Sequence, residues 1–242
     1  MKKFIRNSLG FLRLDLTTNL KYDRLTKYII KKHLKKTSNC IDIGCHKGEI
    51  LDILLNEAPL GKHFAFEPIP DFYSELKNKY KEVQVFPYAL GEIEGVTEFN
   101  YVKNDPAYSG LKEREYSKKD PKIEKLKVQV KKLDEVIPSD IQIDFIKIDV
   151  EGGEYGVLKG GLSLIKNHRP LILFEFGLGA SDYYNIKPED IHTIFSDLKY
   201  GIYTLKDFIS GGSELDLTNF KSLYFSKKEY YFVASPKISI DE

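Results

Sequence analysis

The fold of this chain is decided by the stretch Asp42-Ile43-Gly44-Cys45-His46-Lys47-Gly48, which directly follows the apolar residues Cys40 and Ile41. A short apolar run that ends at glycines indicates a strand turning sharply into a helix, because glycine tolerates the backbone angles of a tight turn. Open α/β sheets bind nucleotides at such strand-to-helix turns. The stretch therefore predicts an α/β fold with a nucleoside-bearing ligand beside its first strand.

The charge of this turn indicates which kind of ligand it holds. Turns that bind NAD or FAD place glycines and a helix N-terminus against a diphosphate, which the carboxylate of Asp42 would repel. The chain also lacks a complete G-x-G-x-x-G motif. Asp42 is instead suited to accept hydrogen bonds from an ammonium group such as that of S-adenosyl-L-methionine (SAM). The alternative interpretation is an ordinary turn with a helix-starting acid.

Composition favours one α/β domain in a reducing compartment. The chain has 242 residues, of which 42% are hydrophobic, and a net charge of +1. Two cysteines, Cys40 and Cys45, provide neither a disulfide framework nor the spacing of a zinc site, so we expect a cytoplasmic protein. The first 36 residues hold eleven Lys or Arg but only two acids, which suits phosphate recognition or peripheral contact with an anionic membrane.

No export signal or membrane span is expected at the N-terminus. The apolar stretch after Met1 is interrupted by Arg6, Arg13 and Asp15 before a signal-peptide core is complete. No run approaches the roughly 20 apolar residues of a membrane-spanning helix.

Apolar runs alternate with helical patterns along most of the chain, which predicts repeated β-α-β units. Strands are expected at residues 39–43, 63–67, 83–86, 143–148, 171–176, 202–205 and 230–233, and helices at 22–36, 50–58, 70–80, 154–166 and 188–198. The last strand is expected to be antiparallel and inside the sheet. Residues 95–130 depart from the pattern, with a hairpin strand at 96–101, a charged stretch and a strand at 128–130; we interpret them as an insertion over one edge.

Four predicted strands end in an acid, namely Asp42, Glu67, Asp149 and Glu175. Because ligands of open α/β sheets bind beyond the carboxyl ends of the strands, we expect these acids on one rim. Glu67 follows Asp42 by 25 residues, close to the spacing at which an acid binds ribose hydroxyls. The alternative is that Glu67 only caps the next helix.

An acidic cluster follows the strand at 143–148, where Asp149, Glu151 and Glu154 surround Gly152 and Gly153. Glu151 and Glu154 also have a structural explanation, because the dipole of the next helix stabilises carboxylates near its N-terminus. Asp149 ends a buried strand and needs a partner, which a ligand cation would supply. A divalent-metal site fits the same acids, although we assign no metal ligand.

Several motifs occur in order along the chain: the turn at 42–48, Phe66-Glu67-Pro68, Leu133-Asp134-Glu135, the segment IKIDVEGGE at 146–154 and Val157-Leu158-Lys159-Gly160. Together they resemble the FkbM family of SAM-dependent methyltransferases. The resemblance runs from about Asn39 to Pro236, so we predict a basic N-terminal helical extension at 1–38 and a SAM-dependent methyltransferase domain at 39–242. At Cys45-His46-Lys47 family members often have Ala-Asn and a variable residue, which leaves the role of His46 open.

The resemblance implies a class I methyltransferase (Rossmann-like) fold, with a seven-stranded, mostly parallel sheet, helices on both faces and the last strand antiparallel. It implies that Asp42, Gly44 and Gly48 hold the methionine part of SAM, Glu67 the ribose and the turn at 88–90 the adenine, with Asp149 near the sulfonium. The cofactor-binding residues expected are Asp42, Gly44, Cys45, Gly48, Glu67, Pro68, Tyr88, Ala89, Leu90 and Asp149.

Methyl transfer to an alcohol needs a base for the hydroxyl proton. The candidates are Asp149, Glu175, Glu151 and His46, and Tyr108 and Ser109 are expected to contact the acceptor. The resemblance favours a hydroxyl of a sugar or glycoconjugate precursor for surface polysaccharide, nucleotide-linked or phosphorylated, and no nucleic acid. The alternatives are a metal-dependent O-methyltransferase of the catechol type, a nucleotide-binding dehydrogenase and a non-enzymatic interaction module.

Overall fold

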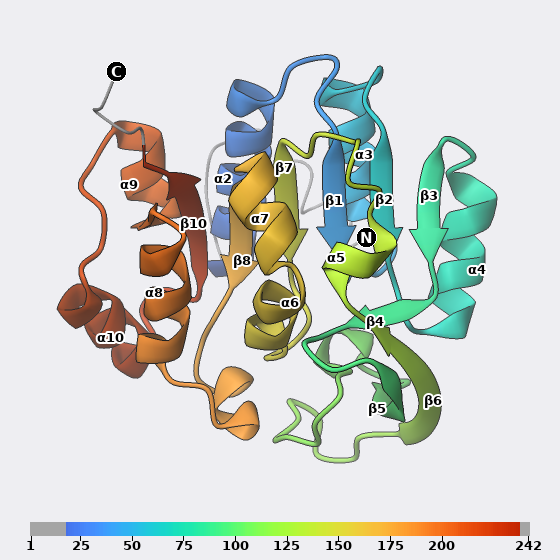
Figure 1. The fold of residues 1–242 in the computed structure, drawn as a ribbon. Helices are drawn as coiled ribbons and strands as arrows, with labels where there is room; N and C mark the ends of the chain where they lie inside the picture. Colours follow the sequence, from blue (N-terminus) through green and yellow to red (C-terminus); the bar gives the residue numbers. More distant parts are fainter. Residues whose placement is uncertain (1–17, 238–242) are drawn as a thin grey trace.

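The structure of the chain is a computed structural model, and it describes residues 18–237. Seven strands form the main sheet in the order β3-β2-β1-β7-β8-β10-β9 (Figure 1). Their bounds are β1 Cys40–Ile43, β2 His63–Phe66, β3 Val83–Phe86, β7 Phe145–Ile148, β8 Leu171–Glu175, β9 Tyr200–Thr204 and β10 Tyr231–Pro236. Only β10 runs antiparallel to its neighbours β8 and β9. The predicted mostly parallel sheet with an antiparallel strand in its interior is confirmed.

Helices cover both faces of this sheet. One face packs against α2 Thr18–His33, α3 Glu49–Glu57, α4 Pro70–Lys79 and α9 Leu205–Ser210. The other face packs against α5 Leu133–Val136, α6 Glu154–Gly160, α7 Leu162–His168, α8 Pro188–Asp197 and α10 Leu217–Ser226. With both faces covered, β1, β2 and β7 are buried along their whole length, which explains their nearly continuous apolar sequences.

The insertion forms a second sheet of three strands, ordered β4-β6-β5. Its strands are β4 Tyr88–Leu90, β5 Gly95–Val102 and β6 Ile123–Lys131, and β5 pairs antiparallel with β6 as the hairpin prediction expects. Ile69 and Phe72 at the start of α4 share a small apolar core with this sheet. Figure 1 shows β4, β5 and β6 beyond the arrowheads of the main strands, so the second sheet lies at the end where ligands of open α/β sheets bind.

Two local predictions are wrong, and three short helices were not predicted. The helix expected at 154–166 is divided into α6 and α7 at Gly161, whose φ of −122° and ψ of 17° are not helical. Gly160 lies close to Gly91, the residue after β4: a Cβ on Gly160 would lie 2.3 Å from the carbonyl oxygen of Gly91. The turn expected at 88–90 is strand β4, which pairs with β6. The short helices α5, α9 and α10 were not predicted.

Helix α2 shares a core with the sheet. Ile29 and Ile30 are fully buried, and they belong to the same apolar cluster as Cys40, Leu51 and Leu205. The division of the chain at residue 38 stays a prediction, and residues 1–17 of the predicted extension lie outside the described residues. In the described part of the chain, no helix is long and apolar enough to span a membrane.

Candidate active site

A cleft of about 1230 Å³ opens at the carboxyl ends of β1, β2, β7 and β8. The second sheet, the start of α2 and the segment before β10 complete its walls. The predicted site residues that line it are Gly44, Cys45, His46, Glu67, Pro68, Tyr88, Ala89, Leu90, Tyr108, Ser109, Asp149, Glu151 and Glu175. Asp42 and Gly48 are the two predicted site residues that do not line the cleft.

The glycines of the first turn permit close packing within the protein. Gly44 has φ 74°, and a Cβ on it would lie 1.8 Å from the carbonyl oxygen of Asp149. Gly48 has φ 82°, and a Cβ there would lie 2.4 Å from the hydroxyl of Tyr80. A side chain at Gly44 would therefore separate the β1 turn from the end of β7, where the acidic cluster begins.

Asp42 and Lys147 are neighbours in register on β1 and β7. Asp42 is fully buried, and neither carboxylate oxygen has a hydrogen-bond partner among the described residues. The nearest cation is Lys147, whose Nζ lies 3.9 Å from Oδ1 of Asp42. Burial raises the pKa of Asp42 to about 6, although Lys147 opposes the shift. A direct contact between Asp42 and a ligand stays a prediction, because Lys147 and not Asp42 reaches the cleft.

Lys147 also pairs with Asp149, with 3.0 Å between Nζ and Oδ2. Burial lowers the pKa of Lys147, but Asp149 and Asp42 outweigh burial and raise it above its usual value. Lys147 was not among the predicted site residues. A lysine within the otherwise apolar strand FIKI was the available signal, because a buried lysine needs a carboxylate partner.

Three carboxylates meet beside this lysine. Oxygens of Asp149, Glu151 and Glu175 lie within 4.8 Å of one another, and the hydroxyl of Tyr231 donates a hydrogen bond to Asp149. Burial alone would raise the pKa of Asp149, yet Lys147 and hydrogen bonds from Glu175 and Tyr231 lower it. Burial and the nearby Asp149 raise the pKa of Glu175 well above its usual range and that of Glu151 to about 8. Asp149 is thus the carboxylate held ionised.

These three acids have the oxygen ligands that a divalent cation prefers. However, two of them already have protein cations as partners. Lys147 pairs with Asp149, and Nη2 of Arg114 lies 2.5 Å from Oε2 of Glu151. A metal ion bound by these acids would have to displace Lys147 and Arg114 or lie against their positive charges.

Glu67 is held at the end of β2 by backbone donors. The N–H groups of His46 and Ile69 donate to its two carboxylate oxygens, both at 2.9 Å. Burial raises the pKa of Glu67 to about 7, although these hydrogen bonds oppose the shift. The imidazole of His46 packs edge-on against Phe72, and its Nδ1 lies 3.7 Å from Glu49. His46 lines the cleft, but whether it acts as a base stays a prediction.

The two residues expected at the acceptor have different environments. The ring of Tyr108 lies beneath the guanidinium of Arg114, 4.6 Å from its Cζ to the ring centroid. Ser109 is buried, and its Oγ accepts a hydrogen bond from the N–H of Val102 at 3.0 Å. Ser109 therefore holds the loop against β5. Arg114, like Lys147 and Tyr231, was missed from the sequence, because nothing in its charged neighbourhood distinguishes it from the surrounding lysines.

The cleft fits SAM on two observations. At its floor Asp149 is a carboxylate held ionised, which suits a ligand that carries an ammonium and a sulfonium. A buried acid fixed by backbone amides, Glu67, stands at the end of the second strand, where an acceptor for ribose hydroxyls is required. Tyr88, Ala89 and Leu90 line the neighbouring wall, and Tyr88 stacks on Phe86 at 6.0 Å between ring centroids.

Comparisons with known proteins agree with this fit. A family model described as "Methyltransferase FkbM domain" matches residues 42–201, more than half of the chain. The structure of methyltransferase FkbM from Methylobacillus flagellatus is 19% identical and similar with a TM-score of 0.50 over 84% of this chain. This chain spans only 44% of that protein. A putative rRNA-methylase from Clostridium thermocellum is 12% identical with a TM-score of 0.50, over 93% of this chain and 99% of that one. No curated protein matches.

Proposed function

The chain belongs to the FkbM methyltransferase family, and from this premise we propose that it transfers a methyl group to a hydroxyl of a sugar or glycoconjugate precursor. It is a SAM-dependent methyltransferase of the class I fold. The choice of oxygen as the methylated atom and of a saccharide as the acceptor is the proposal. We place this activity in the cytoplasm, in the synthesis of a surface polysaccharide, by analogy with the family.

The proposed cofactor site joins the turns after β1, β2 and β7 to strand β4. Gly44 and Cys45 would contact the methionine part, Glu67 would accept hydrogen bonds from the ribose, and residues 88–90 would lie against the adenine. SAM supplies a methyl group on a positively charged sulfur, so the leaving group needs no further activation. The protein must align the acceptor hydroxyl and remove its proton, and a positioned base contributes about 10²–10⁴-fold to the rate.

The observation that carries the proposal is the environment of Asp149. Lys147 and Tyr231 hold this carboxylate ionised at the floor of the cleft, so it can accept the proton of an acceptor hydroxyl. Glu175 is the less suitable base at neutral pH, because its raised pKa keeps it protonated.

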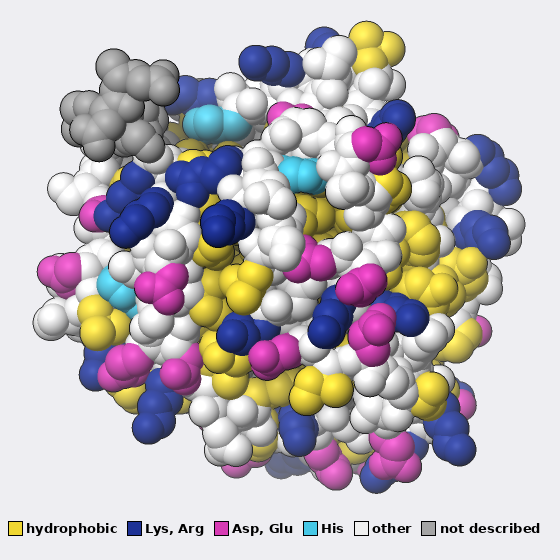
Figure 2. Space-filling view, in the orientation of Figure 1, with side chains coloured by type: hydrophobic (Ala, Val, Ile, Leu, Met, Phe, Trp, Pro, Cys, Tyr) yellow, Lys and Arg dark blue, Asp and Glu magenta, His cyan; other side chains and the backbone are white. Residues whose placement is uncertain are grey.

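The aromatic lining of the cleft supports a saccharide acceptor. Tyrosine provides both a ring that packs on the apolar face of a sugar and a hydroxyl that bonds to it. Tyrosines that line the cleft are Tyr22, Tyr88, Tyr108, Tyr116, Tyr224, Tyr230 and Tyr231. On the face drawn in Figure 2, Lys and Arg side chains gather at the upper left, and acidic and basic side chains are interspersed over the rest of that face.

The test is a methyl-transfer assay with radiolabelled SAM and a panel of neutral sugars, sugar phosphates, nucleotide sugars and catechol. We expect labelled product from a sugar, formed about 10²–10⁴-fold more slowly when Asp149 is replaced by Asn. Label transferred only to catechol, or only to amines, would contradict the proposal.

A metal-assisted mechanism of the catechol type is the second candidate. It is favoured by the three carboxylates within 4.8 Å of one another and opposed by their pairing with Lys147 and Arg114. Adding EDTA to the same assay separates the two mechanisms, since only the second loses its rate.

A further inference from the structure

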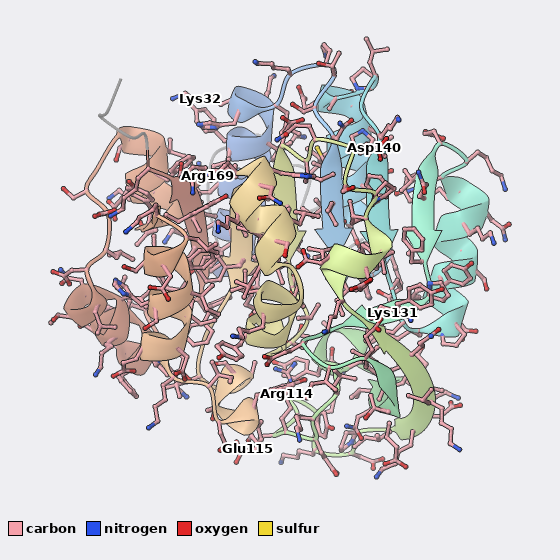
Figure 3. All side chains as sticks on the ribbon, viewed as in Figure 1. Lys32, Arg114, Glu115, Lys131, Asp140 and Arg169 are labelled. Carbon is pink, nitrogen blue, oxygen red and sulfur yellow. The ribbon has the colours of Figure 1, made fainter. Side chains whose placement is uncertain are left out.

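Arg114 reaches the cleft from the loop between β5 and β6. Its side chain is only 6% exposed, and it joins three segments that line the cleft. Nη2 lies 2.5 Å from Oε2 of Glu151 in the turn after β7, and Nη1 donates to the carbonyl oxygen of Gly179 at 3.2 Å. Nη2 also lies 3.4 Å from the carbonyl oxygen of Ala107. Figure 3 shows Arg114 below α6, beside the loops of the second sheet.

The charges around Arg114 bear on what can bind beside it. Asp149, Glu151 and Glu175 contribute three carboxyl groups within 4.8 Å of one another, and Lys147 and Arg114 contribute two cations. Each cation is already paired with one of the acids. A phosphate or carboxylate of an acceptor would have to compete with Asp149 or Glu151 for these two cations, whereas an uncharged hydroxyl would not, which favours an uncharged group at this end.

The Arg114–Glu151 pair presents a donor and an acceptor side by side. The guanidinium has five N–H donors in a fixed plane, and its Nε is buried without a hydrogen-bond partner among the described residues. The Glu151 side chain is 22% exposed, so part of it faces open space in the cleft that it lines. Two hydroxyls on adjacent carbons of a sugar ring match this arrangement, since one can donate to the carboxylate while its neighbour accepts from the guanidinium.

We propose that Arg114 and Glu151 form an acceptor subsite for two neighbouring hydroxyls of an uncharged sugar ring, one of which is methylated. This inference rests on the proposed function and narrows its acceptor class. With this subsite, any phosphate or nucleotide of the acceptor lies away from the hydroxyl that is methylated. Tyr108, stacked under the guanidinium, keeps its plane fixed.

A purely structural role for Arg114 makes a different prediction. If the pair only ties the loop to the turn after β7, replacing Arg114 affects every acceptor equally. If the pair binds the diol, the replacement affects acceptors that have both hydroxyls and spares those that lack one. The coupling between a protein change and a substrate change therefore separates the two roles.

The experiment measures kcat/KM with methyl hexosides, their monodeoxy analogues lacking one of two adjacent hydroxyls, hexose phosphates and uronates. The enzymes are wild type, Arg114→Gln, Arg114→Lys and, as a control on the same loop, Lys112→Gln, whose side chain is exposed. We expect a neutral diol to be the best acceptor and its monodeoxy analogue to react about 10- to 100-fold more slowly. Arg114→Gln removes that difference. Lys112→Gln keeps it, and the affinity for S-adenosylhomocysteine (SAH) is the same in all the enzymes.

Three results would overturn the subsite. A preference for phosphorylated or acidic sugars contradicts its neutral character, and equal loss on diol and monodeoxy acceptors in Arg114→Gln makes the residue a structural anchor. Equal rates for diol and monodeoxy acceptors in the wild type contradict it without any variant. In these cases methyl transfer to sugars still supports the proposed function. If the protein binds SAH but methylates no sugar, both the subsite and the proposed function are contradicted.

Discussion

The ammonium of Lys147 lies 3.0 Å from the carboxylate of Asp149, two residues further along the chain and directly after the end of β7. Alternate residues of a strand share one face, so the sequence Lys-Ile-Asp places the cation directly beneath the acid. The same ammonium lies 3.9 Å from the buried Asp42 of the neighbouring strand. Lys147 thereby joins the first motif of the chain to its acidic cluster.

Replacing Lys147 by Met should therefore damage both stability and turnover. It leaves Asp42 buried without a cation, a change that costs about 3–5 kcal/mol when one partner of a buried pair is removed. It also raises the pKa of Asp149. Urea denaturation and kcat measure the two effects. The matched control is Lys131→Met, which breaks the more exposed pair with Glu94 at 3.1 Å and should cost less than about 1 kcal/mol. Equal stability of the two variants would contradict the role of Lys147.

Asp149→Asn should separate catalysis from folding. The variant keeps the shape of the side chain but removes the charge that accepts the hydroxyl proton, so we expect kcat to fall about 10²–10⁴-fold. SAH affinity should change much less. Asp140→Asn is the control, because Figure 3 shows Asp140 at the opposite end of the sheet and its side chain is exposed. A variant with wild-type turnover would make Asp149 a structural acid.

Gly44→Ala should be strongly destabilising. Its Cβ would lie 1.8 Å from the carbonyl oxygen of Asp149 at φ 74°, so the turn after β1 must move away from β7. Gly211→Ala is a matched control, with φ 71° and no atom within 4 Å of its Cβ. The control carries only the cost of the left-handed backbone, about 1–2 kcal/mol. Chemical denaturation of both variants measures the difference, and similar losses would show that the close contact contributes nothing.

The main sheet was predictable because its central strands are short apolar runs between turn residues. CIDI, HFAF and FIKI carry few polar side chains, and each polar one has a role at the site or a buried partner. Strand β4 was not predictable from its own sequence. It pairs with β6, whose residues come about 40 positions later, and that pairing is set by tertiary packing rather than local propensity.

The candidate site was predictable where it depends on strand ends. Glu67, Asp149 and Glu175 line one cleft as expected, because the carboxyl ends of parallel strands meet at one edge. Arg114 was not predictable, since its position depends on how a 20-residue loop folds back onto Glu151. The pairing of Asp42 with Lys147 was also not predictable, because it depends on the register between β1 and β7.

The stability of the protein should fall as the pH rises from about 5 to 8. Burial raises the pKa of Glu154 to about 7 in the folded chain, against 4.5 for the free side chain. Between these values the folded state binds more protons than the unfolded state, so the free energy of unfolding decreases with pH. Glu154→Gln keeps an oxygen for the N–H groups of Val150 and Gly152 and removes the titration. The free energies of unfolding at pH 5 and pH 8, measured by urea denaturation, should differ less in the variant, by up to roughly 3 kcal/mol. An unchanged difference would contradict the assignment.

Calorimetric titration of SAH into the wild type, Glu67→Ala and Glu98→Ala tests most directly whether the cleft holds the cofactor. Glu67 is buried in the cleft, whereas Glu98 lies on the exposed part of β5 and serves as the control. We predict that one SAH binds per chain, that Glu67→Ala weakens binding at least about tenfold by removing hydrogen bonds to a charged acceptor, and that Glu98→Ala binds as the wild type does. Absence of binding to the wild type, or equal affinity in all three proteins, would contradict the account.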